Sequence, residues 1–251
     1  MGYTESVSRI RGEAGTTVNL TILRASSDSV HFDEIEMSFV RAEVKTRTIQ
    51  YRIINGDIGY IRIRQFNQET PNEFREAISE LENSGALKFI FDVRFNPGGD
   101  LDGVTETLDI LLPEGPIIRY TYRNGKEEIR YSDAEDISAP MAVLMNESTA
   151  SAAELFCAAL KDYEKAVLIG AKTYGKGTMQ GIYALSDRVT ALKISNARYF
   201  PPFSDCYDGI GIYPHIETDL PEELLREKSF DKITDDEDTQ LQAAVNALSD
   251  E

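Results

Sequence analysis

The stretch Leu87-Lys-Phe-Ile-Phe-Asp-Val93, followed at once by Arg94-Phe-Asn-Pro-Gly-Gly99, decides the fold class of this sequence. A short, mostly apolar run is typical of a strand buried on both faces, as in a parallel sheet. Further strands and helices are predicted along the chain, with strands at 142–145 and 166–169 and helices at about 101–112 and 151–163. This succession predicts an α/β protein with a mixed, largely parallel sheet and covering helices.

A helix with a clear start signal precedes this strand. Thr70 can cap it, Pro71 suits its first position and Glu73 completes a capping box. Apolar residues recur at helical spacing and predict one buried face, formed by Phe74, Ala77, Ile78 and Leu81. Gly85 is expected to end the helix.

Three polar or glycine-rich loops follow the predicted strands. They are Asn96-Pro-Gly-Gly99, Asn146-Glu-Ser-Thr-Ala-Ser151 and Tyr174-Gly-Lys-Gly-Thr178. Ligand sites in open α/β sheets gather at the carboxyl ends of the strands. We therefore expect a functional site where these three loops meet.

Ser151 stands between a loop and a predicted helix, and this position has two interpretations. Ser151-Ala-Ala-Glu154 is a capping box, and most such serines only cap helices. The position also suits a nucleophile, because the free N–H groups at a helix start favour the oxyanion that forms when a serine attacks a carbonyl. The alanines at 152 and 153 would leave access to the serine open.

Lys176 lies between two glycines and also has two interpretations. It can be an exposed loop lysine, but flanking glycines let the backbone fold closely around one side chain. A lysine acts as a general base only where burial brings its pKa down toward neutrality. Apolar neighbours such as Tyr174 and Met179 could provide the dry surroundings.

A phosphate-binding P-loop is an alternative interpretation of Gly170-Ala-Lys-Thr-Tyr-Gly-Lys176. That motif needs Ser or Thr directly after the lysine to hold magnesium, and here Gly177 takes the place. Gly177 and Thr178 also precede a predicted strand, whereas phosphate binds at the start of a helix. Nucleotide binding is therefore disfavoured.

The composition argues against several classes of function. The net charge is −17, from 26 basic and 43 acidic residues, and such a surface repels nucleic-acid phosphates. The two cysteines, Cys157 and Cys206, and the two histidines, His31 and His215, form no zinc-binding motif. We interpret His215 as an ordinary loop residue, so a Ser-His-Asp triad is not expected. No apolar run is long enough to span a bilayer.

The two ends of the chain differ from this pattern. Val18-Asn-Leu-Thr-Ile22 alternates apolar and polar residues, which predicts a half-buried strand that needs a partner elsewhere. Residues 25–29 are predicted to be a polar linker. Met1-Gly2-Tyr3 has neither the basic start nor the apolar run of a signal peptide. The acidic tail ends in a predicted amphipathic helix with an apolar stripe of Leu241, Ala244, Val245 and Leu248.

Together these loops resemble the carboxy-terminal (tail-specific) processing proteases. The matching segments are, in order, Asp92-Val-Arg-Phe-Asn-Pro-Gly-Gly99, Ser148-Thr-Ala-Ser-Ala-Ala-Glu154, Thr173-Tyr-Gly-Lys-Gly-Thr-Met-Gln180, Ala197-Arg-Tyr-Phe200 and Gly209-Ile-Gly-Ile-Tyr-Pro214. Arg11-Gly12 through Arg24 is similar to the last part of the family's PDZ domain. The likeness runs from about residue 6 to about residue 220, and the joint order and spacing of the motifs make it specific.

The resemblance implies a role for several residues. Ser151 matches the nucleophile, Lys176 the general base that replaces histidine in this family, and Gln180 the glutamine that orients the lysine. The implied oxyanion hole consists of backbone N–H groups, those of Ala152 and of either Gly98 or Gly99. The implied reaction is hydrolysis of peptide bonds near the C-terminus of a polypeptide substrate, through an acyl-enzyme and with no metal or cofactor.

The same resemblance implies a domain plan and a setting. Residues 26–251 would be a peptidase core with a ClpP/crotonase-like fold and an acidic tail helix, and residues 1–25 a partial PDZ segment. Its peptide groove would be missing or incomplete, since PDZ grooves bind a peptide as an extra strand. The family resemblance implies an extracytoplasmic or cell-envelope location in a bacterium, and it is compatible with a homo-oligomer. The alternative is a catalytically silent binding or assembly module on a protease-like scaffold.

Overall fold

The computed structural model describes residues 2–25, 31–43, 47–186 and 190–249. The chain divides into two compact units, Met1–Thr46 and Arg47–Glu251. Residues 26–29, most of the predicted polar linker, lie outside the described residues.

The first unit is a helix joined to a hairpin. The strand expected near residues 18–22 is β1 (Thr17–Ala25), and its partner is β2 (Phe32–Val40), which pairs with it antiparallel. α1 (Tyr3–Ile10) precedes the hairpin. The Arg41 guanidinium donates to the Ile10 carbonyl oxygen at 2.8 Å and so connects the end of the helix to the end of β2.

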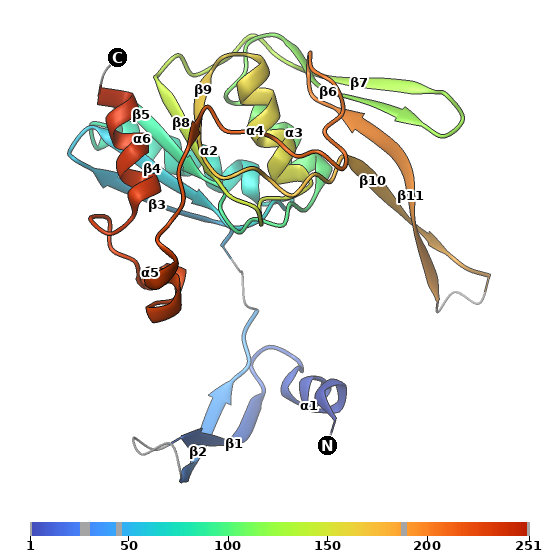
Figure 1. The fold of residues 1–251 in the computed structure, drawn as a ribbon. Coiled ribbons are helices and arrows are strands. Elements are labelled where there is room, and N and C mark those ends of the chain that lie inside the picture. Colours follow the sequence, from blue (N-terminus) through green and yellow to red (C-terminus); the bar gives the residue numbers. More distant parts are fainter. Residues whose placement is uncertain (1, 26–30, 44–46, 187–189, 250–251) are drawn as a thin grey trace. The chain divides into compact units, whose positions relative to one another are not determined.

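The second unit is built on a six-stranded, mostly parallel sheet (Figure 1). In spatial order its strands are β12 (Ile216–Glu217), β9 (Ala166–Gly170), β8 (Met141–Met145), β5 (Lys88–Asp92), β4 (Ile58–Ile63) and β3 (Ile49–Ile54). Every neighbouring pair is parallel except β3 and β4. The parallel strands and the α/β fold class predicted from the apolar runs are confirmed.

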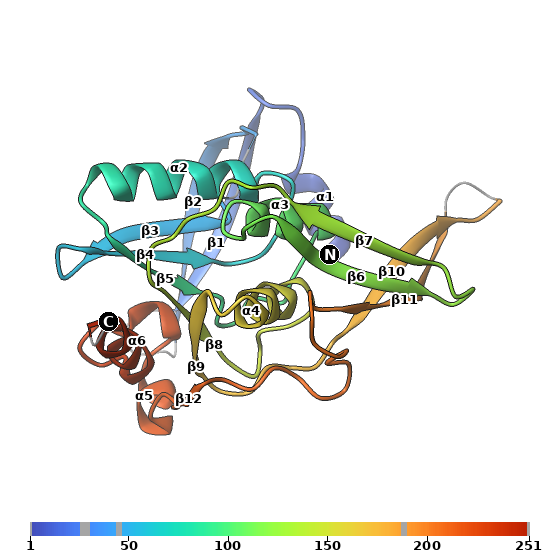
Figure 2. The ribbon, with the colours of Figure 1, turned by 90° about the horizontal axis from the view of Figure 1, so that it is seen from above.

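The buried strands carry apolar side chains on both faces of this sheet. In β5, Phe89 and Phe91 pack on one face and Ile90 on the other, because successive side chains of a strand alternate. The covering helices are α2 (Thr70–Asn83), α3 (Leu101–Asp109) and α4 (Ala152–Asp162) on the first face and α6 (Thr239–Ser249) on the second (Figure 2). The apolar stripe predicted for the tail helix is therefore confirmed as the contact of α6 with the sheet.

The capping box predicted for α2 is wrong. Thr70 is the first residue of the helix, and its backbone N–H is capped by Asn67 Oδ1 at 3.0 Å. Glu73 turns away from the cap because its carboxylate accepts the backbone N–H groups of Thr48, at 2.8 Å, and Ile49, at 3.2 Å. The carboxylate thus joins the helix to the start of β3, a tertiary contact that local capping rules do not include.

A second, antiparallel sheet extends from the core (Figure 1). In spatial order its strands are β10 (Thr178–Ala184), β11 (Ala191–Phe200), β6 (Gly115–Tyr122) and β7 (Glu127–Ser132). Between β12 and α6 lie the short helix α5 (Glu222–Glu227) and the 3-10 helix η1 (Phe230–Lys232). In the part of the chain that the structure describes, no helix is long and apolar enough to cross a bilayer.

Candidate active site

The loops that follow β5, β8 and β9 meet where these parallel strands end. Between them and β10 lies a cavity of about 610 Å³. All six residues predicted to form the site line it, namely Gly98, Gly99, Ser151, Ala152, Lys176 and Gln180. The wall also carries apolar side chains, among them Leu101, Leu155, Met179 and Ile182. Three separate sequence motifs are thus brought together in one partly apolar cavity.

Ser151 holds an unusual backbone conformation at the start of α4. Its φ is 57° and its ψ −119°, a combination that a residue with a side chain rarely adopts. Glu154 accepts the Ser151 backbone N–H at 2.9 Å, which is the glutamate half of the predicted capping box. Strain of this kind persists only where the surroundings impose it, and it is common at functional sites. A sharp, strained turn of this kind exposes the nucleophile in α/β-hydrolases.

Glu154 connects the serine loop to the lysine loop. Its carboxylate is fully buried and accepts four hydrogen bonds. One comes from Ser151 N–H, and the others come from the lysine loop, namely from Thr173 Oγ1 at 2.6 Å, Gly175 N–H at 2.6 Å and Lys176 N–H at 2.8 Å. The sequence identified Glu154 only as a local cap, because partners some twenty residues away leave no periodic signal.

Tyr199 on β11 is a second residue whose role the sequence did not reveal. Its hydroxyl donates to the Lys176 carbonyl oxygen at 2.6 Å and lies 3.3 Å from Ser151 Oγ. Burial raises the pKa of Tyr199 to about 12, so the phenol stays protonated and can donate at any ordinary assay pH. Tyr199 therefore joins the backbone of the candidate base to the candidate nucleophile. The segment Ala197-Arg-Tyr-Phe200 resembles the family, but the resemblance implies no role for the tyrosine.

Replacing Tyr199 with phenylalanine is expected to lower kcat/KM about tenfold, which corresponds to about 1.4 kcal/mol. The ring would still fill its place, but the part-buried Lys176 carbonyl oxygen would lose the hydroxyl that donates to it. Steady-state kinetics on a peptide, the substrate class that the family resemblance implies, measure the effect. Tyr174→Phe is the matched control, since that side chain is 69% exposed, and unchanged kinetics in both variants would refute the role of Tyr199.

The Asn96–Gly99 turn places backbone donors beside the start of α4. Gly98 has a φ of 98°, and a Cβ there would lie 2.8 Å from Ala152 N, so only glycine fits this approach. The Gly98 N–H already donates to Asn96 Oδ1 at 2.8 Å. Within the described ranges, neither Gly99 N–H nor Ala152 N–H donates to a protein acceptor. Of the two glycines that the sequence left open, this arrangement favours Gly99 as the second donor of an oxyanion hole.

The glycines beside Lys176 allow its loop to pack tightly against the 205–212 segment. Gly175 has a φ of 92°, and a Cβ there would lie 3.0 Å from Gly211 N. The Gly177 N–H donates to Asp208 Oδ1 at 2.9 Å, and a Cβ at Gly177 would lie 2.9 Å from Asp208 N. The close packing expected from the Gly-Lys-Gly pattern is therefore present.

The Lys176 side chain is half-buried and lines the cavity together with Met179 and Gln180. Among the hydrogen bonds and ion pairs of the described residues, none joins its amine to Ser151 Oγ or to Gln180. Catalytic hydrogen bonds are often long before substrate binds. Tyr174, which was expected to shield the lysine, points into solvent and does not line the cavity, so the sheltering surface comes from elsewhere.

The other candidate groups lie away from this cavity. His215 borders a larger cavity of about 1150 Å³ that contains none of the six predicted residues. Its Nδ1 accepts the Leu168 N–H at 3.0 Å, and burial, together with the charge of Lys161, lowers its pKa. Cys157 is fully buried in α4, where burial raises the pKa of its thiol. In the described ranges, no three His, Cys, Asp or Glu side chains are grouped so as to hold a metal ion.

The P-loop alternative is wrong. The segment from Gly170 to Lys176 leads into β10, so no helix start is available there to bind a phosphate.

Residues 57–218, more than half of the chain, match the model of peptidase family S41. The chain belongs to peptidase family S41. It is 35% identical over 225 residues to a carboxy-terminal-processing protease of Bartonella bacilliformis, covering 86% of this chain and 50% of that protein. A carboxy-terminal processing protease of Bacillus subtilis is 33% identical over 224 residues, covering 88% and 47%. This S41 chain thus spans about half the length of the curated relatives it matches.

Solved structures are similar to this S41 chain as well. A photosystem II D1 C-terminal processing protease matches with a TM-score of 0.64 and 26% identity, over 85% of this chain and 59% of that one. An S41 protease of Bacteroides fragilis matches with a TM-score of 0.67 and 20% identity, over 94% of this chain and 68% of that one, and supports the fold alone. The family resemblance inferred from the sequence is therefore confirmed.

Proposed function

We propose that this chain is the catalytic core of a serine endopeptidase in which Ser151 is the nucleophile and Lys176 the general base. The observation that carries the proposal is the shared cavity. Ser151, held in a strained conformation at a helix start, lines the same wall as the lysine and as two backbone N–H groups, those of Gly99 and Ala152, that have no acceptor among the described residues. This set provides a nucleophile, a base and an oxyanion hole, which are the parts that acyl transfer needs.

The reaction follows from these roles. The neutral Lys176 amine takes the hydroxyl proton of Ser151 as Oγ bonds to the peptide carbonyl carbon, and Gln180 orients the amine. The N–H groups of Ala152 and Gly99 donate to the oxyanion. The lysine ammonium then gives its proton to the leaving amine as the C–N bond breaks. A water molecule that the lysine deprotonates attacks the ester, and its proton returns to Ser151 as the acid product leaves.

The proposed substrate is an extended polypeptide segment close to a C-terminus. Two relatives carry names that describe carboxy-terminal processing, and the family likeness extends to the lysine loop. β10 follows the lysine loop directly and is an edge strand of the antiparallel sheet. Two of its residues, Met179 and Ile182, line the cavity. A free strand edge can bind an extended peptide as an additional strand, with alternate side chains facing the cavity.

Replacing Ser151 with alanine tests this function. We expect cleavage of an unfolded polypeptide to fall by at least about 10⁴-fold, because no acyl-enzyme can form. Product analysis by mass spectrometry would show whether the cleaved bonds lie near the C-terminus. Cleavage that survives at the wild-type rate in a folded Ser151→Ala variant would overturn the assignment.

The second candidate, a silent binding module, is motivated by one observation. Ser151 Oγ is hydrogen-bonded to Tyr199, whereas no bond to the lysine amine occurs in the described residues. If the wild-type chain and the Ser151→Ala variant bind an unfolded polypeptide with the same affinity, and neither cleaves it, this candidate replaces the peptidase.

The family likeness supports two wider proposals. Residues 1–25 correspond to the end of a PDZ domain and residues 26–251 to the peptidase core. The protein resides outside the cytoplasm or at the cell envelope, which fractionation of cells that express the chain's natural gene would test.

A further inference from the structure

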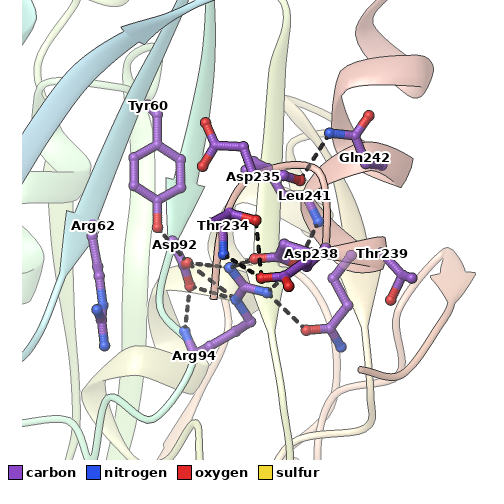
Figure 3. A network of polar contacts seen from close by, with 12 residues as sticks. Tyr60, Arg62, Asp92, Arg94, Thr234, Asp235, Asp238, Thr239, Leu241 and Gln242 are labelled. Atoms are coloured by element: carbon purple, nitrogen blue, oxygen red, sulfur yellow. Dashed lines mark hydrogen bonds and ion pairs between the residues drawn. The ribbon is translucent and has the colours of Figure 1, made fainter. Parts of the chain in front are cut away.

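Arg94 opens the glycine-rich loop after β5, and its guanidinium is buried in a network of carboxylates (Figure 3). All five of its N–H donors are used. Nε and Nη2 donate to Asp92, at 3.0 and 2.6 Å, and Nη1 and Nη2 donate to Asp238, at 2.9 and 2.8 Å. The remaining donor of Nη1 reaches Gln240 Oε1 at 3.0 Å. A planar guanidinium with all donors occupied is fixed in position as well as in charge.

On the side of the sheet, the network is formed by Asp92. Asp92 is fully buried at the end of β5 and also accepts the Tyr60 hydroxyl at 2.6 Å and the Arg94 backbone N–H at 2.9 Å. Burial alone would raise the pKa of Asp92, but the Arg94 charge and these hydrogen bonds outweigh burial and lower it. Asp92 is therefore ionised in the folded protein at neutral pH.

The other side of the network comes from the C-terminal segment, 144 residues farther along the chain. Asp238 stands just before α6 and also accepts the Leu241 N–H at 3.0 Å, so the same carboxylate caps the helix and holds Arg94. The ring of Phe230 lies 4.7 Å from the Arg94 guanidinium and 4.8 Å from the ring of Phe95. Asp238 and Phe230 lie beyond residues 57–218, which match the family model, whereas Arg94 and Phe95 lie within them.

Hydrogen bonds hold the backbone between Arg94 and the cavity. Phe95 has a φ of 61°, unusual for a bulky residue, and its N–H donates to Asn146 Oδ1 at 3.0 Å. Asn96 donates through Nδ2 to the Ile63 carbonyl and accepts the Gly98 N–H. Strained backbone of this kind persists only when its surroundings over-determine it. Arg94 and Phe95 therefore set the direction in which the chain enters the glycine turn.

We propose that Asp238 is a positioning residue of the active site, which acts through Arg94 to hold the Asn96–Gly99 turn in the conformation that forms the oxyanion hole. This role rests on the proposed peptidase function. A buried ion pair often adds little net stability, because the desolvation of both charges offsets their attraction. What the ion pair between Asp238 and Arg94 contributes is a defined geometry. Arg94 lies only five residues before Gly99 in the chain. The C-terminal segment thereby becomes part of the catalytic apparatus.

Asp238→Asn, compared with Asp235→Asn, tests the proposal. Asp235 lies in the same segment and pairs with Arg52 through two hydrogen bonds, of 2.7 and 2.6 Å, but the side chains of this pair are 45% and 43% exposed. The two variants thus remove the same charge from the same segment. We expect Asp238→Asn to lower kcat at least tenfold while KM changes less than twofold, and Asp235→Asn to leave both within twofold. Phe230→Leu, which leaves no polar group unpaired, should also lower kcat.

Hydrogen exchange provides a measurement that does not depend on activity. Amides of residues 95–100 should exchange at least tenfold faster in Asp238→Asn than in Asp235→Asn, whereas those of β8 should exchange equally. Equal exchange at 95–100 in the two variants would overturn the proposal, and so would faster exchange spread evenly over the sheet, which would indicate a purely structural role. If the wild-type chain cleaves no polypeptide, the peptidase proposal fails, and this comparison still decides whether Asp238 holds the turn.

Discussion

Replacing Lys176 with alanine is expected to lower kcat by about 10²- to 10⁴-fold, the range that a positioned general base contributes. The amine is the basic side chain that the lysine loop brings to the cavity of Ser151, and His215 borders a different cavity. Without the amine, Ser151 would lose the base that the lysine loop brings to it. The fold should survive, because Glu154 and Tyr199 hold the backbone at 176 through main-chain groups, which alanine keeps.

Lys172→Ala is the matched control for this variant. Lys172 lies in the same loop, but its amine is exposed and sits 5.5 Å from the ring of Tyr213. It should retain wild-type kcat and KM. A folded Lys176→Ala variant that kept more than a tenth of the wild-type kcat would contradict the assignment of the base.

Replacing Glu154 with glutamine should lower both the free energy of unfolding and the activity. Glutamine matches the shape of the side chain, but its amide would face backbone N–H groups with a second donor. Oε2 accepts Ser151 N–H and Lys176 N–H, and Oε1 accepts Gly175 N–H and the Thr173 hydroxyl, so either orientation of the amide leaves donors unpaired. A buried unpaired donor costs about 1–3 kcal/mol, and we expect a loss of about 2–4 kcal/mol in the free energy of unfolding.

The activity of this variant should fall about 100-fold, since the carboxylate positions both loops of the proposed dyad. Urea unfolding and steady-state kinetics measure the two effects. Glu147→Gln is the control, because that glutamate is exposed in the same serine loop, and it should change neither quantity. A Glu154→Gln variant with wild-type kcat would show that the two loops keep their positions without the carboxylate.

The sequence could predict the sheet because a strand that is buried on both faces appears as a short run of mostly apolar residues. The apolar run at 88–92 alternates between two packed layers, with Phe89 on one side and Ile90 on the other. The capping box of α2 was wrong for the opposite reason. Glu73 binds the backbone at Thr48, and this partner, 25 residues distant, overrides the local preference.

The candidate site was predictable in its parts but not in its connections. Ser151 and Lys176 were each ambiguous, and only their joint order with Asn-Pro-Gly-Gly and Gln180 indicated a peptidase. Tyr199 comes from a strand 48 residues after the serine, and Asp238 from a tail 144 residues after Arg94. Contacts of this length depend on tertiary packing, which leaves no spacing pattern along the chain.

Covalent labelling by a fluorophosphonate tests the central claim most directly. The reagent modifies a serine only where a base activates the hydroxyl and an oxyanion hole receives the phosphoryl oxygen. Mass spectrometry of the folded wild-type chain should show one adduct per chain, on Ser151, and the labelling rate should fall at least 100-fold in Lys176→Ala. A chain that cleaves polypeptide while Ser151 remains unmodified, or that labels equally fast without Lys176, would contradict the account.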